Sequence, residues 1–210
     1  MGPSLFIIVR ANVNMGIRLL LFSLLLLSNP EFSLCCECFP THIQTDFCAA
    51  LFVIKARVHA QEEPQSSDGF DYWLRYQVNI STIFEGQQIF LLTNRVLIST
   101  PGPLQSCGPQ LLKTGQEYLI SGYKENSTLR VAPCAGVKFW TDDYAEIISN
   151  IKCGCKIYTP RTWSIPNLEP PPPKTDELCI APSRGTCSFK WGVCKKDEND
   201  VCHWKLIKLC

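Results

Sequence analysis

The chain has 210 residues and a formal net charge of +1 at pH 7. This near-neutral balance lacks the strongly basic character of nucleic-acid-binding domains. Thirteen cysteines are far more than an ordinary chain of this length carries, which indicates an oxidising compartment and small domains stapled by disulfides. The odd count predicts either one free thiol or one cysteine that processing removes.

Residues 1–35 have the pattern of a secretory signal peptide. Positive charge at Arg18 precedes an apolar run over residues 19–27, which is too short to span a bilayer. Cleavage after Cys35 would make Cys36 the first residue and would leave an even number of cysteines. We therefore expect a free α-amine on a cysteine that can form a disulfide.

Two points about this segment stay open. Translation could start at Met1 or Met15, and cleavage could leave Cys35 or Cys36 as the first residue. No later apolar run approaches the roughly 18 residues of a membrane-spanning helix. We therefore expect a secreted protein of the extracellular space or matrix, with no membrane span.

Alternating hydrophobicity predicts a series of strands after residue 50. In the first strand Ile54, Ala56 and Val58 share one face, and in the second apolar side chains alternate with polar ones from Tyr72 to Phe84. The strands expected here cover residues 51–58, 72–84, 89–98, 118–122 and 128–131.

A helix is expected over residues 140–151, because Trp140, Tyr144 and Ile147 begin an apolar stripe at helical spacing. Five strands, a loop-rich path and one or two helices predict a mainly β fold, a small barrel over residues 36–153.

The composition changes after residue 153. Prolines recur between residues 160 and 173, which is typical of an extended linker. We expect a domain boundary at Gly154, followed by a cysteine-rich C-terminal subdomain, residues 154–210. This short segment should depend on its disulfides because it cannot bury a large core.

Several motifs now resemble the tissue inhibitors of metalloproteinases. The first is Cys36-x-Cys38-x-Pro40-x-His42-x-Gln44-Thr45-x-Phe47-Cys48. Matching motifs follow in order: Val53-Ile54-Lys55-Ala56-Arg57, Ser106-Cys107-Gly108, Glu117-Tyr118-Leu119-Ile120-Ser121-Gly122 and Val131-x-x-Cys134. The match covers residues 36–155 well, and beyond them it depends mainly on the number and order of the cysteines.

The resemblance implies a netrin-like OB-fold, a five-stranded barrel with flanking helices, and a small disulfide-rich C-terminal subdomain. It also implies a disulfide pairing that spacing alone could not select. The implied bridges are Cys36–Cys107, Cys38–Cys134, Cys48–Cys153, Cys155–Cys210, Cys179–Cys187 and Cys194–Cys202.

The resemblance further implies inhibition of secreted or membrane-anchored zinc metalloproteinases. The α-amine and carbonyl of Cys36 would bind the catalytic zinc of the target protease, so the chain would need no cofactor of its own and would not be an enzyme. The protease-contacting ridge would comprise Cys36, Glu37, Cys38, Phe39, Pro40, Thr100, Pro101, Gln105, Ser106 and Cys107. Glu37 departs from the family, which usually has a small hydroxyl residue there.

Two other classes of function are open at this point. One is a non-inhibitory netrin-like module that binds matrix or signalling proteins, and the other is a secreted thiol–disulfide enzyme with a C-x-C motif. His42, His59 and His203 are too scattered to indicate a metal site. Asn79 and Asn126 begin glycosylation sequons.

Overall fold

The computed structural model describes residues 38, 41–62, 73–90, 93–102, 111–134, 136–160, 172–173 and 175–210. Those residues all belong to one compact unit. The expected signal peptide, residues 1–35, and most of the proline-rich linker lie outside the described residues. Within the described part of the chain, no helix has the length and apolar character needed to cross a membrane.

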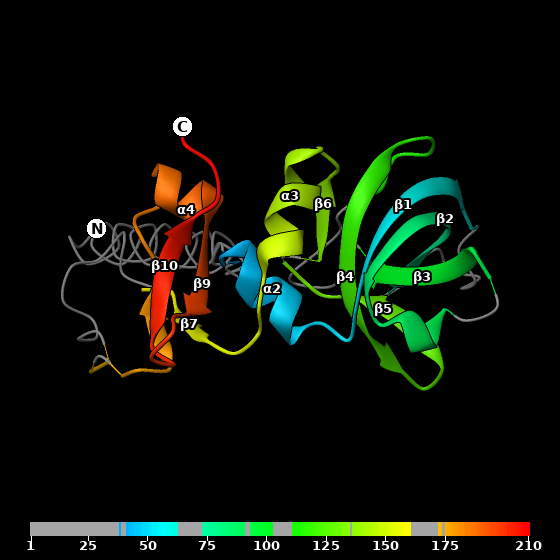
Figure 1. Cartoon of the computed structure of the whole chain (residues 1–210). Helices are drawn as coiled ribbons and strands as arrows, with labels where there is room; N and C mark the ends of the chain where they lie inside the picture. Colours follow the sequence, from blue (N-terminus) through cyan, green and yellow to red (C-terminus); the bar gives the residue numbers. More distant parts are fainter. Residues whose placement is uncertain are drawn as a thin grey trace, which may run out of the picture. The chain divides into compact units, whose positions relative to one another are not determined.

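Five strands form a closed barrel (Figure 1). They are β1 (Phe52–Gln61), β2 (Trp73–Glu85), β3 (Arg95–Pro101), β4 (Glu117–Glu125) and β5 (Thr128–Val131). Their order is β1-β2-β3-β5-β4, and pairing of β4 with β1 closes the ring. Within the described barrel strands, β3 and β5 pair in parallel and the other pairs are antiparallel. A short β6 (Val137–Phe139) extends the sheet beyond β4. This architecture confirms the expected OB-fold.

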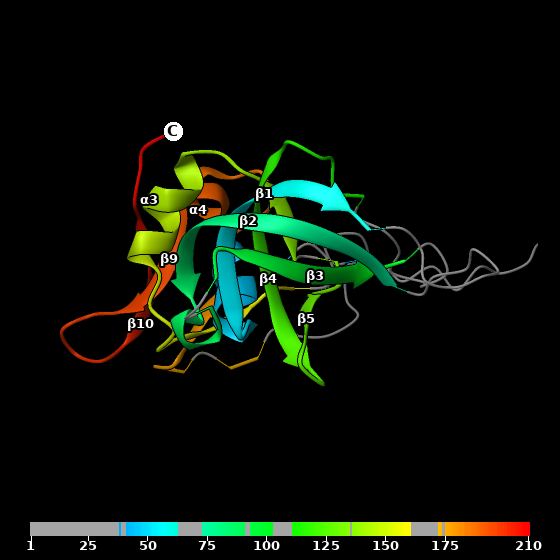
Figure 2. The ribbon, with the colours of Figure 1, turned by 90° about the vertical axis from the view of Figure 1, so that its right-hand side faces the viewer.

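The apolar side chains of the predicted alternating pattern fill the core of the barrel. Ile54, Ala56 and Val58 are buried in its core, as are Tyr76 and Val78 from β2. Figure 2 shows β1, β2 and β3 side by side. The alternation expected for β2 continues to Ile80, which packs against the barrel core, and fails beyond it, because register shifts against β1 insert extra β2 residues that turn the following side chains.

The prediction of a strand over residues 89–98 is only partly correct. A 3₁₀ turn, η1 (Gln87–Ile89), comes first, and β3 begins at Arg95. Gly86 enters this turn with a φ of 82°, and a Cβ atom there would lie 2.6 Å from the carbonyl oxygen of Leu51. The backbone therefore turns where continuous apolar sequence predicted an extended strand.

Three α-helices accompany the barrel in the described part of the chain. They are α2 (Ile43–Ala49), α3 (Asp143–Asn150) and α4 (Cys187–Trp191). The expected helix over residues 140–151 corresponds to α3, whereas α2 and α4 have no counterpart among the predicted elements. Ile147 and Ile148 of α3 pack on Val53 and Leu119, which point outward from β1 and β4.

The C-terminal residues build two small sheets. In one, β7 (Lys156–Tyr158) pairs in parallel with β8 (Leu178–Ile180); in the other, β9 (Gly192–Lys196) pairs antiparallel with β10 (Cys202–Leu206). Trp191 and Val193 join the apolar cluster that covers α3 and the outer face of the barrel. The domain boundary expected at Gly154 stays a prediction.

The structure contains the Cys38–Cys134 and Cys48–Cys153 disulfides that the resemblance implies. Cys36–Cys107 lies outside the described residues. The implied C-terminal pairing, Cys155–Cys210, Cys179–Cys187 and Cys194–Cys202, is wrong. The structure instead has Cys155–Cys202, Cys179–Cys194 and Cys187–Cys210.

The register of β9 and β10 explains this difference. Cys194 lies opposite Trp204, so Cys202 is a diagonal neighbour rather than a direct one. Diagonal positions across an antiparallel pair are too far apart for an undistorted disulfide. Cys194 reaches Cys179 of β8 instead, with a Cα–Cα distance of 6.1 Å.

Candidate functional site

Two barrel strands end at the same edge. Because β3 and β5 are parallel, with Ile98 opposite Leu129, their carboxyl ends point the same way. The chain leaves β5 there and reaches Cys134, whose disulfide holds Cys38 at a Cα–Cα distance of 5.2 Å. The segment that contains the expected chelating residue is therefore anchored covalently at this edge.

The described part of the expected ridge is small. Cys38 is exposed, whereas Thr100 has an exposed fraction of 0% and Pro101 is also buried at the end of β3. The other ridge residues expected from the sequence lie outside the described residues: Cys36, Glu37, Phe39, Pro40, Gln105, Ser106 and Cys107.

Helix α2 follows the ridge segment and is fixed at several points. Cys38–Cys134 precedes it, and Cys48–Cys153 holds its last turn. Asp46 accepts a hydrogen bond from the Thr41 hydroxyl and forms an ion pair with Lys138 of β6 at 3.0 Å. A helix of seven residues is not stable alone, so these contacts maintain it.

His42 caps this helix from inside the protein. Its Nδ1 accepts a hydrogen bond from the backbone N–H of Gln44 at 3.2 Å, and its ring has an exposed fraction of 0%. The rings of Phe189 and Trp204 contact it edge-on, with centroids 5.4 and 5.0 Å away. Burial lowers the pKa of His42, although the nearby carbonyls of Phe189 and Gly192 favour the protonated ring.

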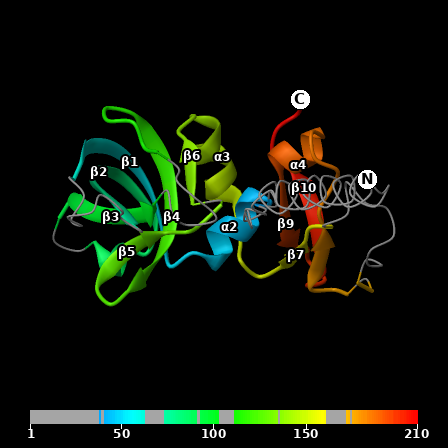
Figure 3. The ribbon, with the colours of Figure 1, turned by 180° about the vertical axis from the view of Figure 1, so that it is seen from behind.

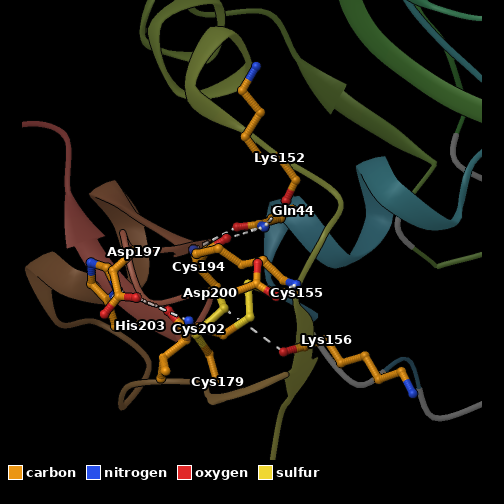
Figure 4. The surroundings of a disulfide bond; sticks show 12 residues. Gln44, Lys152, Cys155, Lys156, Cys179, Cys194, Asp197, Asp200, Cys202 and His203 are labelled. Atoms are coloured by element: carbon orange, nitrogen blue, oxygen red, sulfur yellow. Dashed lines mark hydrogen bonds and ion pairs between the residues drawn. A yellow bond between two sulfur atoms is a disulfide. The ribbon is translucent and has the colours of Figure 1, made fainter. Parts of the chain in front are cut away.

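Gln44 joins α2 to the C-terminal residues (Figure 4). Its Nε2 donates to the carbonyl oxygens of Cys194 at 2.7 Å and Lys152 at 3.0 Å, and its Oε1 accepts from the Cys194 N–H at 2.8 Å. All three of these polar contacts involve a side chain with an exposed fraction of 1%. The opposite views in Figures 1 and 3 both place α2 between the barrel strands and β9.

A hollow of about 300 Å³ lies beside the Cys38–Cys134 bridge. Helix α2 contributes Thr45 and Ala49 to its wall, β4 contributes Tyr123, and Pro133 closes it near the disulfide. Gly122 forms part of the floor, where a Cβ atom would lie 2.0 Å from the carbonyl oxygen of Arg130. Sequence reasoning singled out neither this hollow nor the anchoring roles of His42 and Gln44.

One group of possible metal ligands occurs among the described residues. The sulfur atoms of Cys155, Cys194 and Cys202 all lie within 4.8 Å of one another. Each of the three belongs to a disulfide, so none offers a thiolate to a metal ion. The cluster is structural: it forms the sulfur-rich core of the C-terminal sheets together with Cys179 and Trp204.

A closed OB barrel, a disulfide-tethered N-terminal segment and a disulfide-rich C-terminal part together define a netrin-like class of protein. The family model for tissue inhibitor of metalloproteinase matches residues 34–204. The chain therefore belongs to the tissue inhibitor of metalloproteinase family, which confirms the resemblance and extends it well beyond residue 155. Members of this family are inhibitors rather than enzymes.

Two relatives show the extent of the similarity. Metalloproteinase inhibitor 4 of Mus musculus is 27% identical over 186 residues, which cover 80% of each chain. Metalloproteinase inhibitor 2 of Gallus gallus is 30% identical over 142 residues, which cover 62% of each chain.

Proposed function

We propose that this chain is a secreted inhibitor of zinc metalloproteinases that acts through the first residue of its mature form, Cys36. The observation that carries this proposal is the Cys38–Cys134 disulfide, which tethers the N-terminal segment to one edge of a rigid barrel. Membership of the inhibitor family and the similarity to metalloproteinase inhibitors 2 and 4 support the choice of target.

The chemistry follows from a free N-terminus. A catalytic zinc keeps one coordination position open for water or substrate. The α-amine of Cys36 together with its own carbonyl oxygen forms a five-membered chelate that can displace this water. An α-amine has a pKa of about 7.7–8.0, so a substantial neutral fraction is present at physiological pH.

Preorganisation of the segment favours tight binding. Cys38 lies two residues from the proposed chelating group and is held covalently, while α2 behind it is fixed by Cys48, Asp46 and Gln44. An inhibitor that is already ordered loses less conformational entropy when it binds. Thr100 and Pro101, buried at the end of β3, would support the ridge from beneath.

Glu37 would enter the specificity pocket of the protease. An ionised carboxylate in an apolar pocket is costly unless it is paired. We infer that Glu37 weakens binding to proteases with an apolar pocket and favours those with a basic one. The remaining proposed contacts, which flank this residue, are Phe39, Pro40, Gln105, Ser106 and Cys107.

The test is inhibition of a panel of zinc metalloproteinases by the protein that begins at Cys36. One alanine added before Cys36 should raise the inhibition constant about a hundredfold or more, because the amine no longer reaches the zinc. The matched control carries one alanine after Cys210 and should inhibit normally. Equal inhibition by both extended proteins would refute chelation, and a folded protein that inhibits no protease would favour a netrin-like binding module.

A further inference from the structure

A cavity of about 470 Å³ lies among the helices outside the barrel. Its walls come from the start of α2, from β6, from α3 and from α4. The volume falls within the range of roughly 300–1,000 Å³ that is typical of small-molecule sites. None of its lining residues belongs to the proposed protease-contacting ridge, so any ligand here serves a separate purpose.

Aromatic side chains form most of the apolar wall. Helix α3 contributes Tyr144, and α4 contributes Phe189 and Trp191. The ring of His42 contacts Phe189 edge-on from the protein interior, with centroids 5.4 Å apart, which holds Phe189 in place at the cavity. Aromatic rings pack favourably against one another in stacked and edge-to-face arrangements. The wall therefore favours a ligand whose apolar part is an aromatic ring.

Lys190 places a positive charge at the same wall. Its ammonium group lies 4.8 Å from the centroid of the Trp191 ring, and both residues line the cavity. The attraction between a cation and an aromatic face holds the ammonium there. Within the described chain, Lys190 takes part in none of the ion pairs. The ammonium is therefore positioned but lacks a carboxylate.

The other charged residues of the wall are already compensated. Lys138 pairs with Asp46 at 3.0 Å, and Asp143 pairs with Lys208 at 3.4 Å. Each of these pairs has no net charge, so Lys190 supplies the net charge of the cavity wall. One uncompensated positive charge beside an apolar cavity matches a ligand with a single negative group.

We propose that this cavity binds a small aromatic monocarboxylate. The ring of the ligand packs among Tyr144, Phe189 and Trp191, and its carboxylate lies beside the Lys190 ammonium. Because α3 follows the barrel strands and α4 belongs to the C-terminal part, the ligand contacts both parts of the chain. Bound ligand therefore stabilises the folded protein against unfolding, by mass action.

The first test is calorimetric titration of the full secreted chain with hydrocinnamate and, separately, with hydrocinnamyl alcohol. The two probes have the same aromatic body, and only the acid carries a charge at neutral pH. The natural chain should bind the acid about threefold to fivefold more tightly than the alcohol, because a partly exposed ion pair contributes about that much. Hydrocinnamate should also raise the unfolding temperature in proportion to its occupancy.

The second test uses Lys190→Gln. This variant should bind hydrocinnamate about threefold to fivefold more weakly and should bind the alcohol as the natural chain does. Equal affinity for the alcohol shows that the cavity itself is intact. Lys113→Gln is the matched control, because Lys113 is exposed outside the cavity, and it should change neither affinity by more than about 1.5-fold.

A third variant fills the cavity. Thr141 is exposed and lines it, so Thr141→Trp should weaken both probes about tenfold or more by occupying the space of the ligand. Ala145→Trp is the control, since Ala145 is an exposed residue of α3 that does not line the cavity. It should leave both affinities unchanged.

Four results would overturn the proposal. They are the absence of hydrocinnamate binding by the natural chain, equally tight binding of acid and alcohol, unchanged affinity for the acid in Lys190→Gln, and unchanged affinity in Thr141→Trp. Thermal unfolding without ligand checks that each variant is folded. Protease inhibition should be unchanged in all four variants, so failure of this proposal is distinguishable from failure of the proposed inhibitory function.

Discussion

At the scale of single residues, His42 carries a property that its sequence position does not reveal. Its ring is buried between two aromatic side chains, and burial holds its pKa below the ordinary value of about 6.5. The neutral ring therefore stabilises the fold fully above about pH 6.5. This contribution is lost as the pH falls from 6.5 towards and through the pKa that His42 has in the folded protein. The charges nearest to it, Asp46 and Lys138, act in opposite directions.

We predict that unfolding free energy falls between pH 7 and pH 5 and that His42→Asn reduces this slope. Asparagine keeps the helix cap but does not titrate. The measurement is urea unfolding at several pH values. His59→Gln is the control, because His59 is exposed and takes part in none of the ion pairs found among the described residues. This variant should keep the natural slope. A slope that His42→Asn leaves unchanged would show that another group is responsible.

The two glycosylation sequons lie in different surroundings. Asn126 and Ser127 form an exposed turn between β4 and β5, with φ values of 46° and 70°. Asn79 lies inside β2, paired with both neighbouring strands, and its Oδ1 accepts a hydrogen bond from Arg95 at 3.1 Å. The oligosaccharide can therefore reach Asn126 more readily than Asn79.

We predict that the secreted chain carries an N-linked glycan at Asn126 and none at Asn79. Mass spectrometry before and after enzymatic deglycosylation gives the occupancy of each site. Asn126→Gln and Thr128→Ala should each abolish the mass shift, whereas Asn79→Gln should not. A glycan on Asn79, or no glycan on either residue, would be the contrary result.

At the scale of elements, α2 is the connection between the barrel and the C-terminal sheets. Gln44→Ala should lower the free energy of unfolding by about 1–3 kcal/mol, because the buried N–H and carbonyl of Cys194 lose their partner. Chemical denaturation measures the change. Gln77→Ala is the matched control. Among the described residues the Gln77 side chain makes one long hydrogen bond, at 3.5 Å to Glu62, so its loss should cost less than about 0.5 kcal/mol. An equal loss of unfolding free energy in both variants would show that Gln44 does not stabilise the connection between α2 and the C-terminal sheets.

Sequence reasoning succeeded where one physical signal dominated an element. Alternation located β1 and most of β2, and the apolar stripe of residues 140–151 located α3. It missed α2, because a seven-residue helix that contains β-branched Ile43 and Thr45 owes its existence to disulfides and to Gln44.

The C-terminal pairing had no comparable local signal. Cysteine order did not indicate that β7 and β8 are parallel or that β9 and β10 pair with Cys194 opposite Trp204. These strands have three to five residues each, too few for a clear period. The candidate inhibitory residues came from the family resemblance.

At the scale of the whole molecule, the barrel has its own apolar core and shares a second apolar cluster with the C-terminal residues. Val53 and Leu119 on its outer face, together with α3, pack against Trp191 and Val193 from the C-terminal residues. We predict that the fragment 36–153 folds and still inhibits, because the barrel and its cysteines are self-contained. It should lose about 3 kcal/mol or more of stability, because it exposes this second cluster, removes the aromatic neighbours of His42 and removes the Cys194 hydrogen-bond partner of Gln44.

Denaturation of the fragment and of the full chain, each with its disulfides verified, measures this difference. The inhibition constant is measured on the same preparations. A fragment as stable as the full chain would mean that the shared cluster contributes nothing, and a folded but inert fragment would place part of the inhibitory surface after residue 153.

The central claim is that Cys36 presents a free α-amine, and mass spectrometry of the secreted protein tests it most directly. The account predicts a chain that begins at unmodified Cys36, has lost Cys35 and contains no free thiol, with Cys36 bonded to Cys107. A chain that begins at Cys35 or earlier, or whose first amine is blocked, would contradict the account, because no amine would be available at Cys36 to bind the zinc of a protease.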